Sequence, residues 1–189
     1  MDLLLKDILS KIKMPPEELE TVRGFLLEKR IKKNEFLFRN GEVCNYDSFI
    51  LSGALKAYYI NPVSGKEEIL FFAIESWWAT DLDSFANRTP SIYNIQAVDE
   101  VLLVQIHHQS LQELLQKIPK MERYFRLILQ GYLSSIQRRI ILMNSTTAEE
   151  RYLDFADRYP KIIQKVPQYL IASYLGITPE FLSRIRARK

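Results

Sequence analysis

The side chains with the clearest chemical potential lie at the C-terminal end of the chain, where basic residues gather. Between Lys161 and Lys189 there are six lysines and arginines and one acid, Glu180, so this stretch has a net charge of +5. The other 160 residues have a net charge of −2. Clustered cations predict a polyanionic partner, with a solvated helix face as the alternative explanation.

The same end of the chain has the pattern of two short helices joined by a tight turn. Residues 167–175 (PQYLIASYL) predict a first helix, which Gly176 ends because glycine readily adopts the positive φ of a helix C-cap. Thr178 is a suitable N-cap for a second helix, which would bury Leu182 and Ile185 against the first. This pattern is typical of a helix–turn–helix, whose second helix enters the major groove of DNA by its N-terminal residues. A plain helical hairpin inside a core is the alternative.

Short β-rich runs dominate residues 30–108. They are broken by NG, SG and NPVSG at spacings typical of antiparallel strands, and a further strand pair is predicted at residues 91–98 and 100–107. A helix is predicted before them, at residues 15–30. The sequence therefore predicts a compact β-roll or barrel ahead of the basic end.

A long helix is predicted between the β-rich region and the basic end. The apolar residues follow helical spacing from Ser110 to about Met143, and Pro119 marks the predicted start of the long helix. Its apolar stripe needs a partner, either the same helix of a second chain, which we favour, or the chain's own β-roll. The predicted dimer interface consists of Phe125, Leu129, Tyr132, Ile136 and Ile140.

The composition excludes several classes of site. Cys44 is the only cysteine, so the chain can form no internal disulfide, cysteine-ligated zinc site or iron–sulfur centre. His107 and His108 are adjacent and would point to opposite faces of a strand, so no metal and no cofactor is predicted. The N-terminus lacks the pattern of a signal peptide, and no apolar run approaches the roughly 18 residues of a membrane span. We therefore expect a cytoplasmic protein without a membrane partner.

Both ends of the chain resemble the Crp/Fnr family of bacterial transcription regulators. The tail IASYLGITPEFLSRIR is similar to the helix–turn–helix of that family, and NGEVCNYDSFILSGALKAYY is similar to its β-roll. The resemblance implies an α+β fold, with an N-terminal antiparallel β-roll of the cyclic-nucleotide-binding kind and flanking helices. It divides the chain into a β-roll sensor domain (1–118), a dimerisation helix (119–143) and a helix–turn–helix DNA-binding domain (144–189). Because the sequence stops at Lys189, we expect this last domain to lack the terminal β-hairpin wing of the family.

The resemblance also implies partners and site residues. The expected partners are double-stranded DNA, a second copy of the chain, and RNA polymerase. Glu180 and Arg184 fall where the family reads base edges, which suits a glutamate facing cytosine and an arginine facing guanine. The other predicted DNA-binding residues are Gln168, Thr178, Ser183, Arg186, Arg188 and Lys189.

A cyclic-nucleotide effector is not expected, because the sequence departs from the family pattern in the phosphate cassette. In WWATDLDSFANRTPSIYNIQAV, Thr80 and Asp81 replace a glycine and a glutamate, and Ser91 stands where an arginine would pair with the phosphate. A buried phosphate without its cation is costly. The small-molecule effector is therefore unknown, and its candidate pocket consists of Trp78, Thr80, Asp81, Arg88, Ser91 and Tyr93.

An enzyme on the β-roll is not predicted. A metal-dependent enzyme on such a barrel needs a cluster of histidines with a glutamate, and the two histidines are adjacent. No glycine-rich phosphate loop or nucleophile elbow is present. The sequence therefore predicts a sequence-specific DNA-binding regulator. The alternative is a ligand-sensing or protein-interaction module with a degenerate DNA-binding domain.

Overall fold

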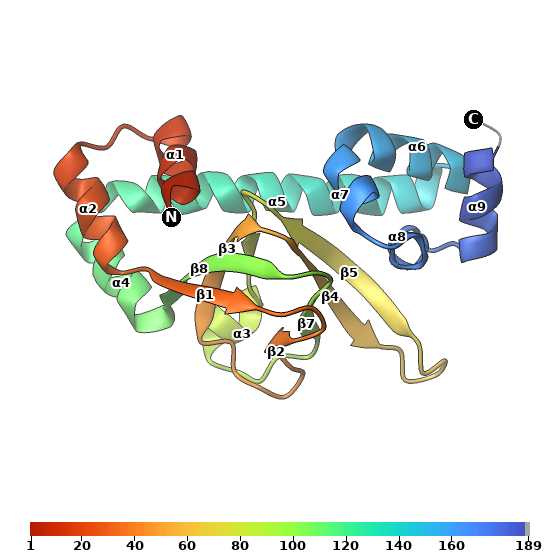
Figure 1. The fold of residues 1–189 in the computed structure, drawn as a ribbon, viewed down its shortest axis with the longest axis horizontal. Helices are drawn as coiled ribbons and strands as arrows, with labels where there is room; N and C mark the ends of the chain where they lie inside the picture. The colour runs from red at the N-terminus through yellow and green to blue at the C-terminus, as the bar shows by residue number, and fades with distance from the viewer. Residues whose placement is uncertain (188–189) are drawn as a thin grey trace.

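The computed structural model describes residues 1–187. Figure 1 shows helix α5 running along the length of the molecule, with a β-roll beside it and the last helices of the chain gathered around its C-terminal half. The helices are α1 (Asp2–Lys11), α2 (Pro16–Gly24), α3 (Leu82–Asn87), α4 (His108–Lys117), α5 (Lys120–Ser145), α6 (Ala148–Arg158), α7 (Pro160–Lys165), α8 (Gln168–Leu175) and α9 (Pro179–Ala187). The strands are β1 (Leu27–Ile31), β2 (Phe36–Phe38), β3 (Tyr46–Ser52), β4 (Ala54–Ile60), β5 (Glu67–Ile74), β6 (Trp78–Ala79), β7 (Asn94–Ala97) and β8 (Val101–His107).

The strands form two antiparallel four-stranded sheets, in the orders β1-β8-β3-β6 and β2-β7-β4-β5. The predicted β-roll is therefore confirmed. Strands form at both predicted positions, 91–98 and 100–107, as β7 and β8, but the prediction that they pair with each other was wrong. Strand β7 lies between β2 and β4 in one sheet, and β8 lies between β1 and β3 in the other. The predicted helix over residues 15–30 is too long, because α2 ends at Gly24 and the following residues pair with β8 as strand β1. Glycine is a poor helix residue, and Leu27–Ile31 gains strand hydrogen bonds instead.

The turn between β3 and β4 requires glycine. Gly53 has a φ of +89°, which side chains other than glycine rarely adopt. A Cβ atom at this position would lie 2.3 Å from the carbonyl oxygen of Glu100. The Ser–Gly step seen in the sequence therefore lets the hairpin approach the backbone before β8.

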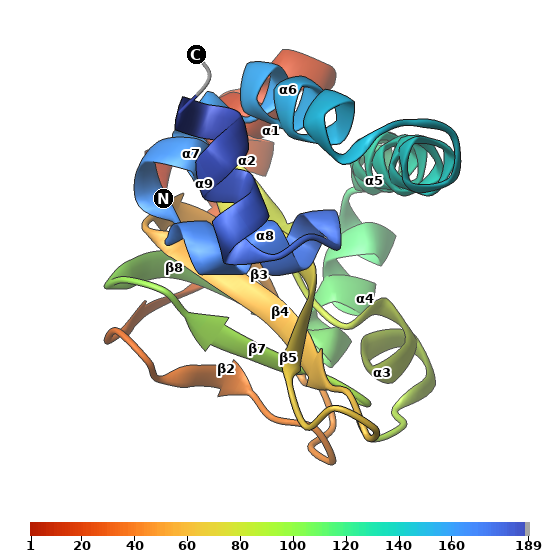
Figure 2. The same ribbon diagram turned by 90° about the vertical axis from the view of Figure 1, so that its right-hand side faces the viewer.

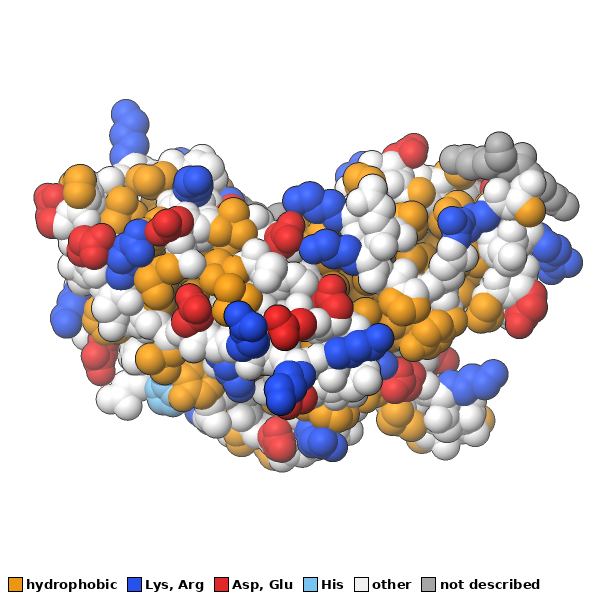
Figure 3. Space-filling model, in the orientation of Figure 1, with side chains coloured by type: hydrophobic (Ala, Val, Ile, Leu, Met, Phe, Trp, Pro, Cys, Tyr) orange, Lys and Arg blue, Asp and Glu red, His pale blue; other side chains and the backbone are white. Residues whose placement is uncertain are grey.

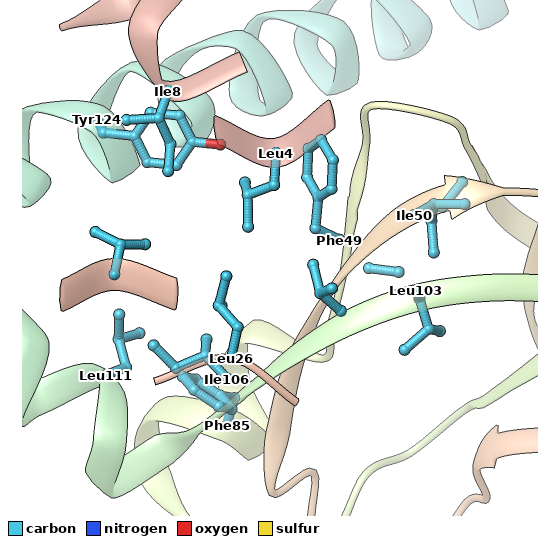
Figure 4. Close-up of a cluster of buried hydrophobic side chains, with 14 of the residues drawn as sticks. Leu4, Ile8, Leu26, Phe49, Ile50, Phe85, Leu103, Ile106, Leu111 and Tyr124 are labelled. Carbon is cyan, nitrogen blue, oxygen red and sulfur yellow. The ribbon is translucent and has the colours of Figure 1, made fainter. Parts of the chain in front are cut away.

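The main core lies between the two sheets and under the N-terminal helices. Figure 4 shows Leu4 and Ile8 of α1 beside Phe49 of β3 and Tyr124 of α5. The Tyr124 side chain is fully buried, and its hydroxyl donates to Asp7 Oδ2 at 2.8 Å and accepts from Trp78 Nε1 at 2.9 Å. The start of α5 is thereby fastened to both α1 and the β-roll.

A second core joins the C-terminal helices to the β-roll. Apolar residues of α6, α7, α8 and α9 pack on the outer face of β4 and β5. The sheet contributes Ala54, Tyr58, Ile69, Phe72 and Ile74. The three-domain division stays a prediction, but the helices after α5 bury their apolar faces on the β-roll as well as on one another.

Asp47 on β3 is a buried carboxyl group whose ionisation the fold opposes. Burial raises its pKa from 3.8 to about 7, although the backbone N–H of Ser48 donates to Asp47 Oδ1 at 2.9 Å. The folded state therefore binds an additional proton between about pH 4 and pH 7. Over that window the free energy of unfolding decreases as the pH rises.

Asp47→Asn is expected to stabilise the protein more at high pH than at low pH, because asparagine has no charge to bury. We expect its effect on the free energy of unfolding to be about 3 kcal/mol more favourable at pH 8 than at pH 4.5. Urea unfolding of both proteins at the two pH values measures this difference. An effect of equal size at both pH values would contradict it.

Candidate nucleic-acid interface

The α8 and α9 helices form the two-helix unit that the sequence predicts. Gly176 ends α8 in the left-handed conformation, at φ 68° and ψ 36°, and the Ile177 N–H donates to the carbonyl of Ala172 at 3.0 Å. The hydroxyl of Thr178 accepts from the Phe181 N–H at 3.2 Å and so caps the start of α9. Leu182 and Ile185 are buried, as predicted, and hold α9 against α8. The turn chemistry therefore fixes the angle between the two helices.

The outer face of α9 is polar and exposed. Figure 2, which faces this end of the molecule, shows α9 lying across α8 on the side turned to the viewer. The predicted DNA-binding residues Gln168, Thr178, Glu180, Ser183, Arg184 and Arg186 are all exposed. Arg188 and Lys189, also predicted to bind DNA, lie outside the residues that the structure describes.

The two predicted base-reading side chains have suitable chemical states. The backbone N–H of Glu180 itself and then the Thr178 hydroxyl hold the pKa of the Glu180 carboxyl below its usual value, so this carboxylate is an acceptor. The guanidinium of Arg184 lies 5.3 Å from the centre of the Phe181 ring, one turn earlier on α9. Phe181, which lies against Arg184, is not among the predicted site residues. An aromatic residue three positions before an arginine is the signal in the sequence that indicates such a contact.

The basic cluster of the C-terminal end is divided in the structure. Lys161 and Lys165 of α7 both contact Glu75, at 3.4 and 3.1 Å, next to the end of β5. Lys165 and then Lys161 lower the pKa of the Glu75 carboxyl. The interpretation of all six basic residues as one cluster was therefore wrong for these two, because a glutamate distant in the sequence pairs with them. Figure 3 shows basic side chains, with acidic ones among them, over the C-terminal helices.

The six residues predicted to line an effector pocket already bond within the chain. Asp81 Oδ1 accepts from the Ser84 N–H at 3.1 Å and caps α3, while Asp81 Oδ2 accepts from the Ser91 hydroxyl at 2.7 Å. The Tyr93 hydroxyl donates to the carbonyl of Thr80 at 3.1 Å, and burial raises the pKa of this tyrosine. The structure thus brings Thr80, Asp81, Ser91 and Tyr93 together.

The guanidinium of Arg88 forms its hydrogen bonds with residues outside this set of four. Its Nη1 donates to the carbonyl of Cys44 at 2.9 Å, and its Nη2 donates to the side chain of Asn45. Trp78 donates to Tyr124 and packs edge-to-face on Phe49, with 5.5 Å between ring centres. The arrangement is that of a satisfied structural network.

Aromatic rings fill the space between the β-roll and α5. Tyr93 contacts Phe71 edge-to-face at 6.2 Å between ring centres, and Phe71 contacts Tyr132 of α5 in the same way at 6.3 Å. Phe125 of α5 lies 5.4 Å from Trp78. Phe125 and Tyr132, which we predicted for the dimer interface, therefore pack on their own β-roll. The apolar stripe of α5 is wide enough for one part of it to contact the β-roll while another part stays exposed.

An exposed apolar stripe remains on the outer side of α5. Leu129, Leu133 and Ile140 are 45%, 56% and 55% exposed, and Ile136 between them is partly exposed. Their spacing of four, three and four residues places them on one face of the helix. Figure 2 views α5 end-on, at the edge of the molecule. Leu133 is an addition to the predicted set.

Neither a membrane-spanning helix nor a cluster of metal ligands occurs in the described residues. None of the helices in residues 1–187 combines the length and the apolar character that a membrane crossing requires. Over the same residues, no three side chains of His, Cys, Asp or Glu are grouped so that they could hold a metal ion. The described residues thus combine a β-roll, a long helix with an exposed apolar stripe and an exposed helix–turn–helix.

Comparisons with known proteins agree with that architecture. The family model of the cyclic nucleotide-binding domain matches residues 28–118. The anaerobic regulatory protein of Haemophilus influenzae is 29% identical over 91% of this chain and 70% of its own length. The transcriptional activator protein Anr of Pseudomonas aeruginosa is 25% identical over 99% of this chain and 80% of its own length.

Solved structures share the fold. FixK2 from Bradyrhizobium japonicum superimposes with a TM-score of 0.72 over 86% of this chain and 83% of that protein, at 18% identity. The catabolite activator protein of Thermus thermophilus superimposes with a TM-score of 0.59 over 93% of this chain and 83% of that protein, at 15% identity. These similarities in sequence and fold support a transcription regulator of the Crp/Fnr family. The predictions of this family, of its fold and of a regulator in place of an enzyme are confirmed.

Proposed function

We propose that the chain binds double-stranded DNA as a homodimer and reads a two-fold symmetric site with α9 of each protomer. The observation that carries this proposal is the exposed face of α9, on which Glu180, Ser183 and Arg184 follow the capped N-terminus of the helix. The N-terminal residues of a recognition helix are the ones that reach base edges. Arg184 can pair bidentately with guanine, and ionised Glu180 can accept from cytosine.

Contacts with the DNA backbone would come from residues around this reading face. Thr178, Ser183 and Arg186 are exposed on or next to α9, and Gln168 is exposed at the start of α8. Such contacts fix the register of a protein on the duplex and make its affinity depend on salt. With Lys161 and Lys165 paired to Glu75, the electrostatic attraction rests on fewer cations than the sequence count implies.

The second copy would pack on the exposed stripe of α5. Leu129, Leu133, Ile136 and Ile140 form an apolar seam that a soluble monomer has no reason to present to water. Parallel pairing of two such helices would place the two α9 helices at the same end of the dimer, since each α9 lies near the C-terminal end of its α5 (Figure 1). A two-fold symmetric protein then matches a two-fold symmetric DNA site.

We propose that cyclic nucleotide does not control the protein. The position of the phosphate cassette is occupied by the hydrogen-bonded Asp81–Ser91 pair, and Phe71, Tyr93 and Tyr132 fill the space towards α5. A buried phosphate there would face the Asp81 carboxylate, whereas the Arg88 guanidinium bonds to Cys44 and Asn45. We also propose a cytoplasmic location, because the proposed ligand is DNA. RNA polymerase remains a predicted partner.

Selection of binding sites from random duplex DNA, without added effector, tests this function. We expect a two-fold symmetric site whose half-sites lie about one helical turn apart, roughly 34 Å. Enrichment only after addition of cyclic AMP would contradict effector independence. Failure to enrich any sequence in either condition would contradict DNA reading and favour the interaction module with a degenerate DNA-binding domain.

A further inference from the structure

Arg139 on α5 joins three parts of the molecule that are far apart in the sequence. Its Nη1 donates to the carbonyl of Leu70, and its Nη2 donates to the carbonyl of Ile69 at 3.2 Å, both on β5. The same Nη2 donates to the carbonyl of Tyr174 on α8 at 3.0 Å. The guanidinium also lies 4.0 Å from the centre of the Tyr174 ring. One side chain of the long helix therefore holds both the β-roll and the helix–turn–helix.

Other contacts surround this connection. The Ser173 hydroxyl of α8 accepts from the Ile69 N–H and donates to the carbonyl of Glu67, each at 3.2 Å. Phe72 of β5 packs on Tyr174, with 5.6 Å between ring centres. Figure 1 shows α8 beside β5 and close to the C-terminal half of α5. The helix–turn–helix is thus docked on the edge of the sheet, and Arg139 closes the junction from the side of α5.

The position of Arg139 on α5 has a geometric consequence. The apolar seam of α5, with Leu133, Ile136 and Ile140, lies on a different face of the helix, because Arg139 is half-buried towards β5 and Tyr174. Leu182 and Ile185 hold α9 to α8. The helix that carries the seam is therefore connected to α9 through Arg139 and α8.

We infer that Arg139 is a positioning residue that fixes the distance between the two α9 helices of the dimer, and with it the spacing between DNA half-sites. This inference rests on the proposed function, because it assigns the spacing of the same DNA site. Each α9 is held to its α8, each α8 is held to α5 through Arg139, and the two α5 helices meet at the two-fold axis. The half-site sequence is read by other residues, so Arg139 acts on spacing and not on base identity.

Arginine suits this position better than lysine. Its planar guanidinium presents several N–H groups in fixed directions and can stack on an aromatic ring, so it can hold three carbonyls and Tyr174 together. A lysine ammonium in the same place would keep the positive charge but would lack the planar set of N–H groups with fixed directions. Lysine at position 139 should therefore keep only part of the preference for one half-site spacing, and glutamine should keep less.

The test is a site selection in which a fixed pair of half-sites is separated by random spacers of different lengths. The wild type, Arg139→Gln, Arg139→Lys and the control Arg123→Gln are compared. Arg123 is an exposed arginine near the start of the same helix, far from α8 in the sequence. We expect the wild type and the control to enrich one spacing. Arg139→Gln should spread over neighbouring spacings and lose about tenfold in its preference for the wild-type spacing, with Arg139→Lys between them.

The outcomes separate this inference from the proposed function. Failure of the wild type to enrich any half-site pair overturns both. A single spacing in the wild type and an unchanged spacing in folded Arg139→Gln overturns only the role of Arg139. Equal loss of spacing preference and half-site preference in Arg139→Gln and Arg139→Lys also overturns it, because that is the result of general destabilisation. If the backbone amides of α8 exchange with solvent faster in Arg139→Gln than in the wild type, while those of α1 exchange at the same rate in both proteins, that result would support the inference independently.

Discussion

Leu133→Asp is expected to produce a folded monomer that binds the full DNA site about 10²- to 10⁴-fold more weakly than the wild type. Leu133 is 56% exposed on the outer seam of α5, so a charge there does not disturb the fold of one chain. In a dimer the same position would be buried against its counterpart, where two unpaired carboxylates are costly. Loss of the dimer removes the high effective concentration at which the second α9 meets its half-site.

Sedimentation equilibrium and DNA-binding titrations measure the two parts of this prediction. Leu9→Asp is the matched control, because Leu9 is an exposed leucine of α1, 47% exposed, and does not belong to the seam. The control should remain a dimer with unchanged affinity. A dimeric Leu133→Asp protein with wild-type affinity would show that the seam is not the contact between protomers.

Arg184→Ala is expected to abolish recognition of the selected site while leaving the dimer intact. A bidentate arginine–guanine pair contributes about 1–3 kcal/mol of discrimination, and the dimer would lose two such pairs. The affinity for the selected site should therefore decrease by about 30-fold or more. Arg184 is exposed and stacks on Phe181, so its removal does not open a cavity.

Arg186→Ala provides the comparison for Arg184→Ala. Arg186 is also exposed on α9 and is proposed to contact phosphate. Its loss should weaken binding to every sequence to a similar extent and reduce the salt dependence of the affinity. Selection experiments and salt titrations on both variants distinguish base reading from backbone contact. If Arg184→Ala selects the wild-type site as well as the wild type does, base reading by this arginine is wrong.

Local signals in the sequence predicted a large part of this fold. Gly176 and Thr178 have the turn and cap chemistry that ends one helix and starts the next, and both act as predicted. The apolar period of α5 predicted a long helix, which runs from Lys120 to Ser145. These signals can be recognised in the sequence because each depends on residues only a few positions apart.

The remainder of the site depends on contacts between distant parts of the chain. The helical period of α5 could not show that Phe125 and Tyr132 pack on the β-roll while Leu133 stays exposed, since all three lie near one stripe. The pairing of Lys165 with Glu75 joins residues 90 positions apart, and the bond from Arg139 to Ile69 joins residues 70 positions apart. Tertiary packing alone decides such contacts.

The core shared by β4, β5 and the last helices has a consequence for synthesis of the protein on the ribosome. Ile69, Phe72 and Ile74 reach their final environment only when α6 to α9 have been made, roughly 110 residues later in translation. At 5–20 residues per second, this apolar sheet face stays uncovered for about 5–20 s. Each nascent chain thus passes through a stage in which the apolar outer face of this sheet is exposed to solvent. A ribosome that stalls within α5 would release a product with a complete main core and a strong tendency to aggregate.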